Sequence, residues 1–174
     1  MEHVANVGSW GELYVMLGTS SAALIGLLFV AASLHLNEIV NNDVYRIRSR
    51  NITLLLVAML VEAATILTPQ PASALGAELI AVNLAGLCPP IALTYQVFFR
   101  NRKIGKPHGF SIYRAIPIHV SYLLGIAGGA ILLTRSNWGM YLVTVSYVSL
   151  LVSAIWNAWL IMLGIGRAEK AKKK

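Results

Sequence analysis

A single carboxylate lies in the middle of a long apolar stretch of this sequence. Glu62 is the only charged residue within residues 51–68. An ionised side chain at the centre of a bilayer costs about 2.5 to 3.5 kcal/mol on insertion scales, so Glu62 should face water or the interior of a helix bundle, with a polar partner. Charges kept at this depth mark ion pathways and proton relays. We therefore interpret Glu62 either as a proton or cation site or as a hydrogen-bonded lock between two helices.

Asn83 is the expected partner of Glu62. Counting inward from the short proline-containing turn at residues 69–74 places the two side chains at similar depth in an antiparallel hairpin. Thr65 lies three residues after Glu62 and so shares its helix face. We predict that Glu62 forms a hydrogen bond with Asn83 and that Thr65 serves the same site.

A row of polar side chains follows the last apolar stretch. Its members recur at i, i+3, i+7 and i+11, which places them on one helix face, and they are Ser146, Ser149, Ser153 and Asn157. Such a face could line a wet pathway for ions. It could also hold helices together, with each hydroxyl bonded to its own helix carbonyl four residues back and Asn157 bonded across a helix interface. Both interpretations stay open at this point.

Two histidines lie near the same predicted side of the membrane. His35 and His119 occupy comparable depths, and two histidines on facing helices could ligate a haem iron or a transition metal. Glu38, three residues after His35, could supply a third ligand. Lone histidines at helix ends are otherwise interfacial or pH-responsive groups, so the cofactor stays unassigned. The single cysteine, Cys88, excludes an internal disulfide.

Motifs of enzymatic chemistry do not occur in the sequence. There is no G-x-S-x-G nucleophile elbow, no glycine-rich phosphate loop, no paired acidic motif and no H-E-x-x-H. A chain that is 57% apolar and 12% charged also leaves little soluble mass for a catalytic domain. We therefore expect that the protein is not an enzyme.

Small residues recur on one face of two apolar stretches. Small side chains at this spacing let helix backbones approach closely, which is how helices pack in lipid. They could pack within one chain or between subunits. The two faces are Gly18, Ala22 and Gly26 in the first stretch, and Ser121, Gly125 and Gly129 in the fourth.

Five apolar stretches position these residues, and each is long enough to cross a hydrocarbon core of about 30 Å. The sequence thus predicts an all-α fold, a polytopic five-helix transmembrane bundle that forms a single domain over residues 1–174. Pro69 and Pro71 end the second span, and the pair Pro89-Pro90 should kink the third. The predicted spans are residues 13–36, 51–68, 75–99, 115–134 and 140–165.

The basic residues predict how the bundle is oriented. Of the 14 Lys and Arg residues, all but Arg135 fall on alternate connections or in the C-terminal tail. The positive-inside rule therefore places the N-terminus outside and the C-terminus in the cytoplasm. The net charge of +7 is spread over short clusters beside apolar stretches, which favours contact with anionic lipid headgroups at the cytoplasmic face over nucleic-acid binding.

The run SSAALIGLLFVAASLHL in the first stretch resembles the first helix of small, uncharacterised bacterial membrane proteins with several spans. The likeness is confined to this stretch. It implies a multi-pass protein of the bacterial inner membrane, and it implies no activity or cofactor.

Taken together, these features favour a homo-oligomeric membrane channel that conducts a small ion. Small-residue faces, a hydroxyl row and a carboxylate at mid-membrane are all expected in such a protein. The alternative is a non-conducting binding or accessory subunit, which would hold a partner protein, or a haem or metal through His35 and His119.

Overall fold

The computed structural model describes residues 10–95 and 112–172. The end of the third predicted span, the basic segment after it and the last two lysines lie outside the described residues. Within them the chain forms helices and no strand. The helices are α1 (Gly11–Leu34), α2 (Leu36–Asn41), α3 (Asp43–Leu67), α4 (Ala72–Tyr95), α5 (Ile112–Leu133) and α6 (Trp138–Lys172).

Five of these helices are long and apolar enough to cross a membrane, which confirms the predicted all-helical fold with five candidate spans. The architecture is that of a multi-pass membrane protein. The spanning segments are Gly11–Leu34, Tyr45–Leu67, Ala72–Tyr95, Ala115–Leu133 and Trp138–Gly166.

The connection before the second span is itself helical, which the sequence analysis did not predict. It forms α2 and the first turns of α3, because residues 37–50 contain neither glycine nor proline. The carboxylate of Asp43 lies in the first turn of α3, where the helix dipole favours a negative charge. Asp43 also pairs with Arg46 at 2.6 Å, one turn along the helix.

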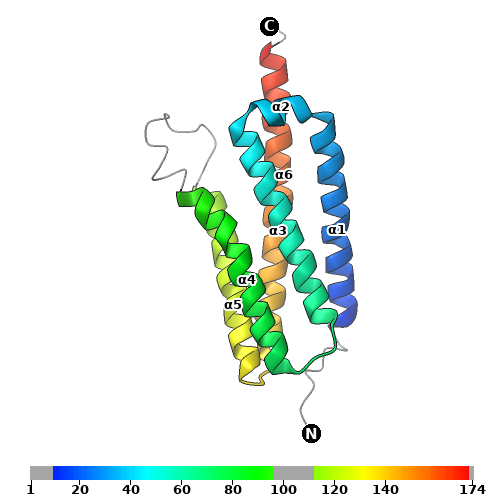
Figure 1. Cartoon of the computed structure of the whole chain (residues 1–174), viewed down its shortest axis with the longest axis vertical. Helices are drawn as coiled ribbons and strands as arrows, with labels where there is room; N and C mark the ends of the chain where they lie inside the picture. Colours follow the sequence, from blue (N-terminus) through cyan, green and yellow to red (C-terminus); the bar gives the residue numbers. More distant parts are fainter. Residues whose placement is uncertain (1–9, 96–111, 173–174) are drawn as a thin grey trace.

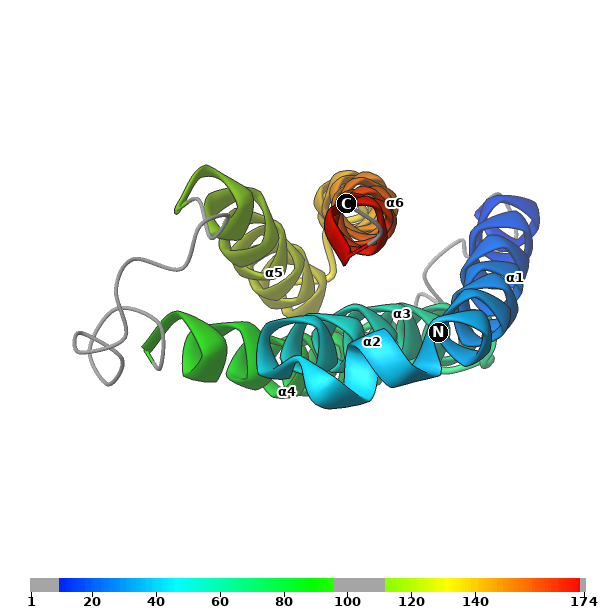
Figure 2. The ribbon, with the colours of Figure 1, turned by 90° about the horizontal axis from the view of Figure 1, so that it is seen from above.

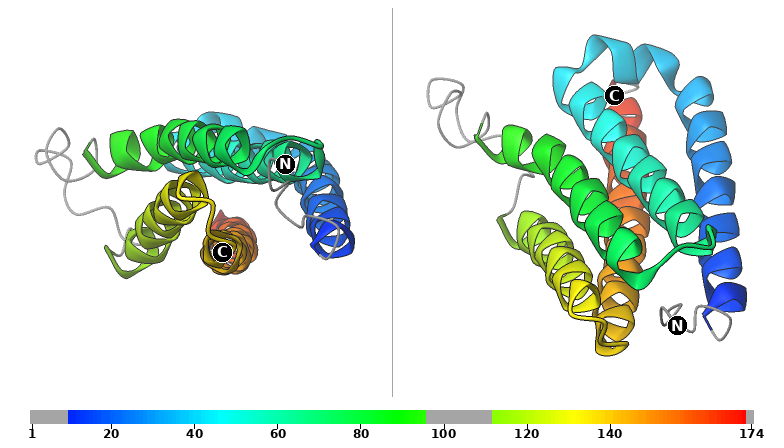
Figure 3. Two further views of the ribbon diagram at one scale, coloured as in Figure 1. Left: turned by 90° about the horizontal axis from the view of Figure 1, so that it is seen from below. Right: turned by 60° about the horizontal axis from the view of Figure 1, so that its bottom comes forward.

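The helices form two layers (Figure 2). In one layer α3 lies between α1 and α4, and α5 and α6 form the other layer; the view from below agrees (Figure 3). α2 lies across one end of the bundle, which we call the α2 end (Figure 1). α1 begins at the opposite end and α6 finishes at the α2 end, as an odd number of crossings requires.

Glycines let α4 approach α5 closely. A Cβ added to Gly76 would lie 2.6 Å from the carbonyl oxygen of Gly129, and a Cβ added to Gly129 would lie 2.8 Å from that of Gly76. Only glycine leaves room for this crossing. Toward the α2 end α4 and α5 lean away from α6, and α3 leans in the same direction as α4 (Figures 1 and 3).

Candidate functional site: a polar core and an adjoining cleft

Glu62 and Asn83 meet in the interior of the bundle. Their exposed fractions are 1% and 0%. Nδ2 of Asn83 donates to Oε1 of Glu62 at 3.5 Å and to the carbonyl oxygen of Leu79 at 2.9 Å. The contact predicted between Glu62 and Asn83 is therefore present, although it is long. Oδ1 of Asn83 is buried and finds no donor among the described residues.

Gly125 of α5 provides the space that Asn83 occupies. A Cβ at position 125 would overlap Oδ1 of Asn83. Gly125 was predicted as a helix-packing residue, and its packing partner is this polar side chain. Asn83 is thus fixed by α3 on one side and by α5 on the other.

Two pairs of hydroxyl groups join α1 to α6. The hydroxyls of Tyr14 and Thr144 lie 2.9 Å apart, and those of Ser21 and Tyr147 lie 3.1 Å apart. The rings of Tyr14 and Tyr147 meet edge to face with 5.8 Å between centroids. Both tyrosines are fully buried. These two pairs were not predicted from the sequence. The presence of a tyrosine inside an apolar helix does indicate that its hydroxyl needs a hydrogen-bond partner.

Three tyrosines from three helices are buried in the interior of the bundle, as Glu62 is. They are Tyr14 of α1, Tyr122 of α5 and Tyr147 of α6. With Glu62 of α3 and Asn83 of α4, every spanning helix contributes a polar side chain to one buried region. We call this region the polar core, and its members are Tyr14, Ser21, Glu62, Asn83, Tyr122, Thr144 and Tyr147.

The hydroxyl row of α6 holds helices together, but its bonds are the reverse of those described for the helix-holding alternative. Ser146 and Ser149 bond across the interface to α5: Ser146 donates to the carbonyl oxygen of Ser121 at 2.6 Å, and the Ser121 hydroxyl donates to that of Ser149 at 2.8 Å. Asn157 instead donates to the carbonyl oxygen of Ser153 in its own helix, at 2.8 Å. The first half of the row therefore holds α5 to α6.

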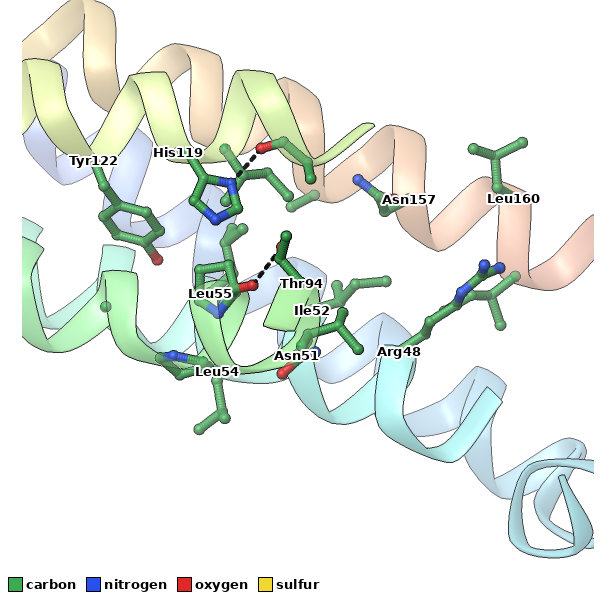
Figure 4. A pocket seen from close by; sticks show the side chains of 18 residues that line it. Arg48, Asn51, Ile52, Leu54, Leu55, Thr94, His119, Tyr122, Asn157 and Leu160 are labelled. Carbon is green, nitrogen blue, oxygen red and sulfur yellow. Dashed lines mark hydrogen bonds between the residues drawn. The ribbon is translucent and has the colours of Figure 1, made fainter. Parts of the chain in front are cut away.

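A cleft lies between α3, α4, α5 and α6, toward the α2 end of the bundle (Figure 4). It is open on one side. Arg48, Asn51 and Asn157 line it nearer the α2 end, whereas His119 and Tyr122 line it from α5. Most of the other lining side chains are aliphatic or proline.

The floor of the cleft adjoins the polar core. Tyr122 belongs to both, and its ring packs on Gly86, where an added Cβ would lie 2.5 Å from the ring. Asn83 is three residues from Gly86 along α4, and Gly125 is three residues from Tyr122 along α5. One helical turn therefore separates the floor of the cleft from Asn83, the partner of Glu62.

His119 and Asn51 are two of the hydrogen-bonding side chains that line the cleft. Nδ1 of His119 lies 2.6 Å from the carbonyl oxygen of Ala115. A carbonyl only accepts, so Nδ1 carries the proton and Nε2 remains available to a ligand. Nδ2 of Asn51 is buried and finds no acceptor among the described residues.

The predicted metal-binding set is not assembled. His35 lies at the junction of α1 and α2, while His119 lies on α5 in the other layer (Figure 2). Within the described ranges, no three His, Cys, Asp or Glu side chains gather in a group that could hold a metal. A comparable predicted depth thus does not make His35, Glu38 and His119 neighbours.

Thr65 was predicted to serve the site of Glu62. It is half-buried, and its backbone carbonyl accepts a hydrogen bond from Gln70 at 3.1 Å.

The two small-residue faces behave differently. Ser121, Gly125 and Gly129 are all buried against neighbouring helices of the same chain. Of the three small residues predicted for the face of α1, only Gly18 packs against another helix of the same chain. A Cβ added to Gly18 would lie 3.1 Å from Cβ of Ala63. Ala22 and Gly26 are exposed.

Comparison of the chain with protein-family models, with curated proteins and with solved structures gave no match.

Proposed function

We propose that the protein conducts a small ion, in the first place a proton, through the polar core of each protomer. The observation that carries this proposal is the buried carboxylate of Glu62, whose partner Asn83 lies one helical turn beneath a cleft, in a bundle interior that also holds the hydroxyl pairs between α1 and α6. In membrane proteins, buried acidic, histidine and hydroxyl groups in series are the parts of proton relays.

The polar groups extend along the bundle from one end toward the other. His119 and Tyr122 line the cleft, Asn83 and Glu62 follow, and the hydroxyl pairs between α1 and α6 continue toward the end where α1 begins. Trp10 and Tyr141 stack beyond them with 4.9 Å between ring centroids. With the predicted orientation, the cleft opens to the cytoplasm and the hydroxyl pairs lie toward the outside.

Dense packing favours a proton over a larger ion. Glu62, Tyr14 and Tyr147 are at most 1% exposed, so the core has no space for a hydrated metal cation. A proton needs only a chain of groups that donate and accept in turn, and rotation of hydroxyls provides such a chain. Short rearrangements of Tyr122 and Asn83 would connect the cleft with Glu62.

The homo-oligomer remains a separate proposal. Glu62 and Asn83 were predicted as an ion site or a helix lock, and Ser146 and Ser153 as part of a polar face; all four are buried inside one chain. The burial of these polar residues therefore favours an ion path within each protomer over a central pore shared between subunits. The exposed Ala22 and Gly26 leave α1 a face on which a second copy can pack, and light scattering of the purified protein measures the subunit number.

The test is proton flux into sealed vesicles that contain the purified protein. A potassium gradient with valinomycin sets the membrane potential, and a trapped pH-sensitive dye reports the flux. Glu62→Gln keeps the shape and an amide that can bond Asn83, but it removes the group that takes up and releases a proton. We expect this variant to lose the flux of the wild type.

Glu78→Gln is the matched control. Glu78 is exposed near the opposite end of the bundle and bonds Gln70 at 2.9 Å, so this variant should conduct like the wild type. Size-exclusion profiles and helical content show that both variants fold. Equal flux through Glu62→Gln and the wild type, or no flux through the wild type above that of empty vesicles, would overturn the proposal.

A non-conducting binding subunit is the second candidate, and the cleft is the observation that favours it. Ligand sites in membrane bundles are cavities between helices with a few convergent polar groups. A wild type that carries no flux but retains a small molecule through purification would support this function. The absorption spectrum tests the haem version, because a Soret band lost in His119→Ala would place a haem in the cleft.

A further inference from the structure

One of the three buried tyrosines of the polar core lacks the hydrogen bond that the other two make. The hydroxyls of Tyr14 and Tyr147 are paired with those of Thr144 and Ser21. Tyr122 is only 2% exposed, yet its hydroxyl has no hydrogen-bond partner within the part of the chain that the structure describes. A buried hydroxyl that stays unsatisfied lowers stability. The hydroxyl of Tyr122 is therefore free to bond a ligand.

This hydroxyl faces the space of the cleft. Within residues 10–95 and 112–172, the fully enclosed side-chain nitrogen and oxygen atoms that lack a partner are Nδ2 of Asn51 and Oδ1 of Asn83. The oxygen of Tyr122 is not one of them, so it retains accessible surface. Because Tyr122 lines the cleft, a molecule in the cleft can reach its hydroxyl.

His119 offers a second accessible group to the same space. Its Nδ1 donates to the carbonyl oxygen of Ala115, so Nε2 of the neutral imidazole is an acceptor. Nε2 is not enclosed either, and it has no partner among the described residues. His119 and Tyr122 are three residues apart on α5, so their Cβ atoms lie about 5 to 6 Å apart on one helix face. Both side chains point from α5 toward α4 (Figure 4).

The described lining of the cleft offers no free charge to a ligand. Arg48 is its charged member, and Arg48 already has an interaction of its own. None of the described lining residues is acidic, and the amide nitrogen of Asn51 is enclosed. An ionised group is costly within a membrane unless it is paired. A neutral ligand is therefore favoured.

Aliphatic and proline side chains form most of the remaining wall. They come from all four helices of the cleft and include Leu55, Pro89, Pro90, Ile118 and Leu160. Walls of this kind, with a few convergent polar groups, are typical of sites for small apolar molecules. The polar groups that orient such a molecule are the acceptor of His119 and the hydroxyl of Tyr122.

We infer that the cleft binds a neutral apolar molecule through a single hydroxyl group, such as a phenol or a long-chain alcohol presents. The ligand hydroxyl donates to Nε2 of His119 and accepts from the hydroxyl of Tyr122, so one group satisfies both side chains. The apolar body of the ligand lies along Leu55 and Ile118. This inference names a ligand class for the cleft of the second candidate function, and it does not rest on the proposed ion path.

A second groove provides an internal control for binding that depends on apolar contact alone. It lies between α1, α3 and α6, and none of its described lining residues carries a hydroxyl, an imidazole or an amide side chain. Its walls include Leu24, Leu28, Ile155, Trp159 and Met162. A molecule that only partitions into apolar surfaces should enter this groove as readily as the cleft.

The experiment is photolabelling of the full-length protein in nanodiscs of zwitterionic lipid. The probe is a phenol that carries a trifluoromethyl diazirine on its ring, and the labelled residues are identified by mass spectrometry. We expect labelling on the walls of the cleft. Unlabelled para-butylphenol should compete about fivefold better than para-butylanisole, whose methyl ether cannot donate, because a hydrogen bond between neutral groups contributes about 1 kcal/mol.

Variants of the two polar residues test their separate roles. His119→Leu removes the acceptor and should abolish the preference for the phenol over the anisole. His119→Gln keeps an acceptor and should restore the preference. A residue that only supports the shape of the cleft would not change the ratio of the two competitors. Tyr122→Phe removes the donor and should weaken competition by the phenol about fivefold.

A further pair of variants tests the location of the site. Ile118→Trp fills the cleft and should abolish the labelling there, whereas Ile116→Trp, on the exposed side of the same helix, should leave it unchanged. Size-exclusion profiles show that the variants fold. Octanol presents the hydroxyl on a flexible chain, so comparing its competition with that of para-butylphenol distinguishes an aliphatic from an aromatic ligand.

Three outcomes would overturn the inference. Equal competition by the phenol and the anisole on the wild type, or an unchanged preference in His119→Leu, would show that no hydroxyl is recognised. Labelling of the second groove as strong as that of the cleft would show apolar partitioning alone. Glu62→Gln should keep the labelling, so a failure of the proposed ion path and a failure of this binding site are distinguished.

Discussion

Replacing Gly76 by alanine should loosen the crossing of α4 and α5. The new Cβ would lie 2.6 Å from the carbonyl oxygen of Gly129, whereas ordinary contact begins at 3.4 Å, so the helices must move apart by about 0.8 Å. The obstacle is backbone rather than a flexible side chain, and overpacking of this kind costs about 1 to 3 kcal/mol. Alanine offsets about 0.5 to 1 kcal/mol of this through its higher helix propensity. We therefore expect the free energy of unfolding to fall by about 1 to 2 kcal/mol.

The assay is reversible unfolding in mixed micelles, with Gly166→Ala as the matched control. No atom of another helix lies within 4 Å of a Cβ added at position 166, so this variant reports helix propensity and should be neutral or slightly more stable than the wild type. Gly129→Ala approaches the same crossing from the other helix and should lose stability like Gly76→Ala. If Gly76→Ala were as stable as Gly166→Ala, the close backbone contact between α4 and α5 would be refuted.

Two further predictions concern the joint between α1 and α6 and the orientation of the chain. In a double-mutant cycle, Ser21→Ala and Tyr147→Phe should couple by about 0.6 kcal/mol, the average for hydrogen bonds between membrane helices; strictly additive effects on unfolding would contradict the 3.1 Å contact. In a Cys88→Ala background, a membrane-impermeant maleimide applied to spheroplasts should label Asn137→Cys and spare Asn41→Cys, both of which are exposed positions. The opposite labelling pattern would reverse the predicted orientation.

Much of the fold could be predicted because the length and apolar composition of a continuous stretch of sequence are enough to identify a membrane span. Length and hydropathy define each of the five spans, and the helix bounds differ from the predicted ones mainly at the start of α3, where the polar connection is also helical, and at the end of α6, which continues to Lys172. The contact of Glu62 with Asn83 was predictable too. A short turn between two spans fixes their relative depth, so counting residues from that turn identifies neighbours.

The remaining parts of the site depend on which helices are adjacent, and depth does not determine this. His35 and His119 were predicted at comparable depth, but they lie in different layers of the bundle. The partner of Tyr14 is 130 residues away, so no local pattern identifies it. The cleft depends on the tilt of α4 and α5 relative to α6, and small residues at a crossing permit close approach without specifying the tilt of the helices.

Three long-range polar contacts join the first half of the chain to the second half. This matters for the order in which the helices enter the membrane during synthesis. Glu62 with Asn83, Tyr14 with Thr144 and Ser21 with Tyr147 each join a residue of α1 or α3 to one of α4 or α6. Because α1 and α3 are synthesised first, Glu62 and the hydroxyls of Tyr14 and Ser21 enter the membrane before their partners on α4 and α6 have been synthesised. Arrival of α4 to α6 then covers them, and the polar contacts set the register in which the later half docks on the earlier one.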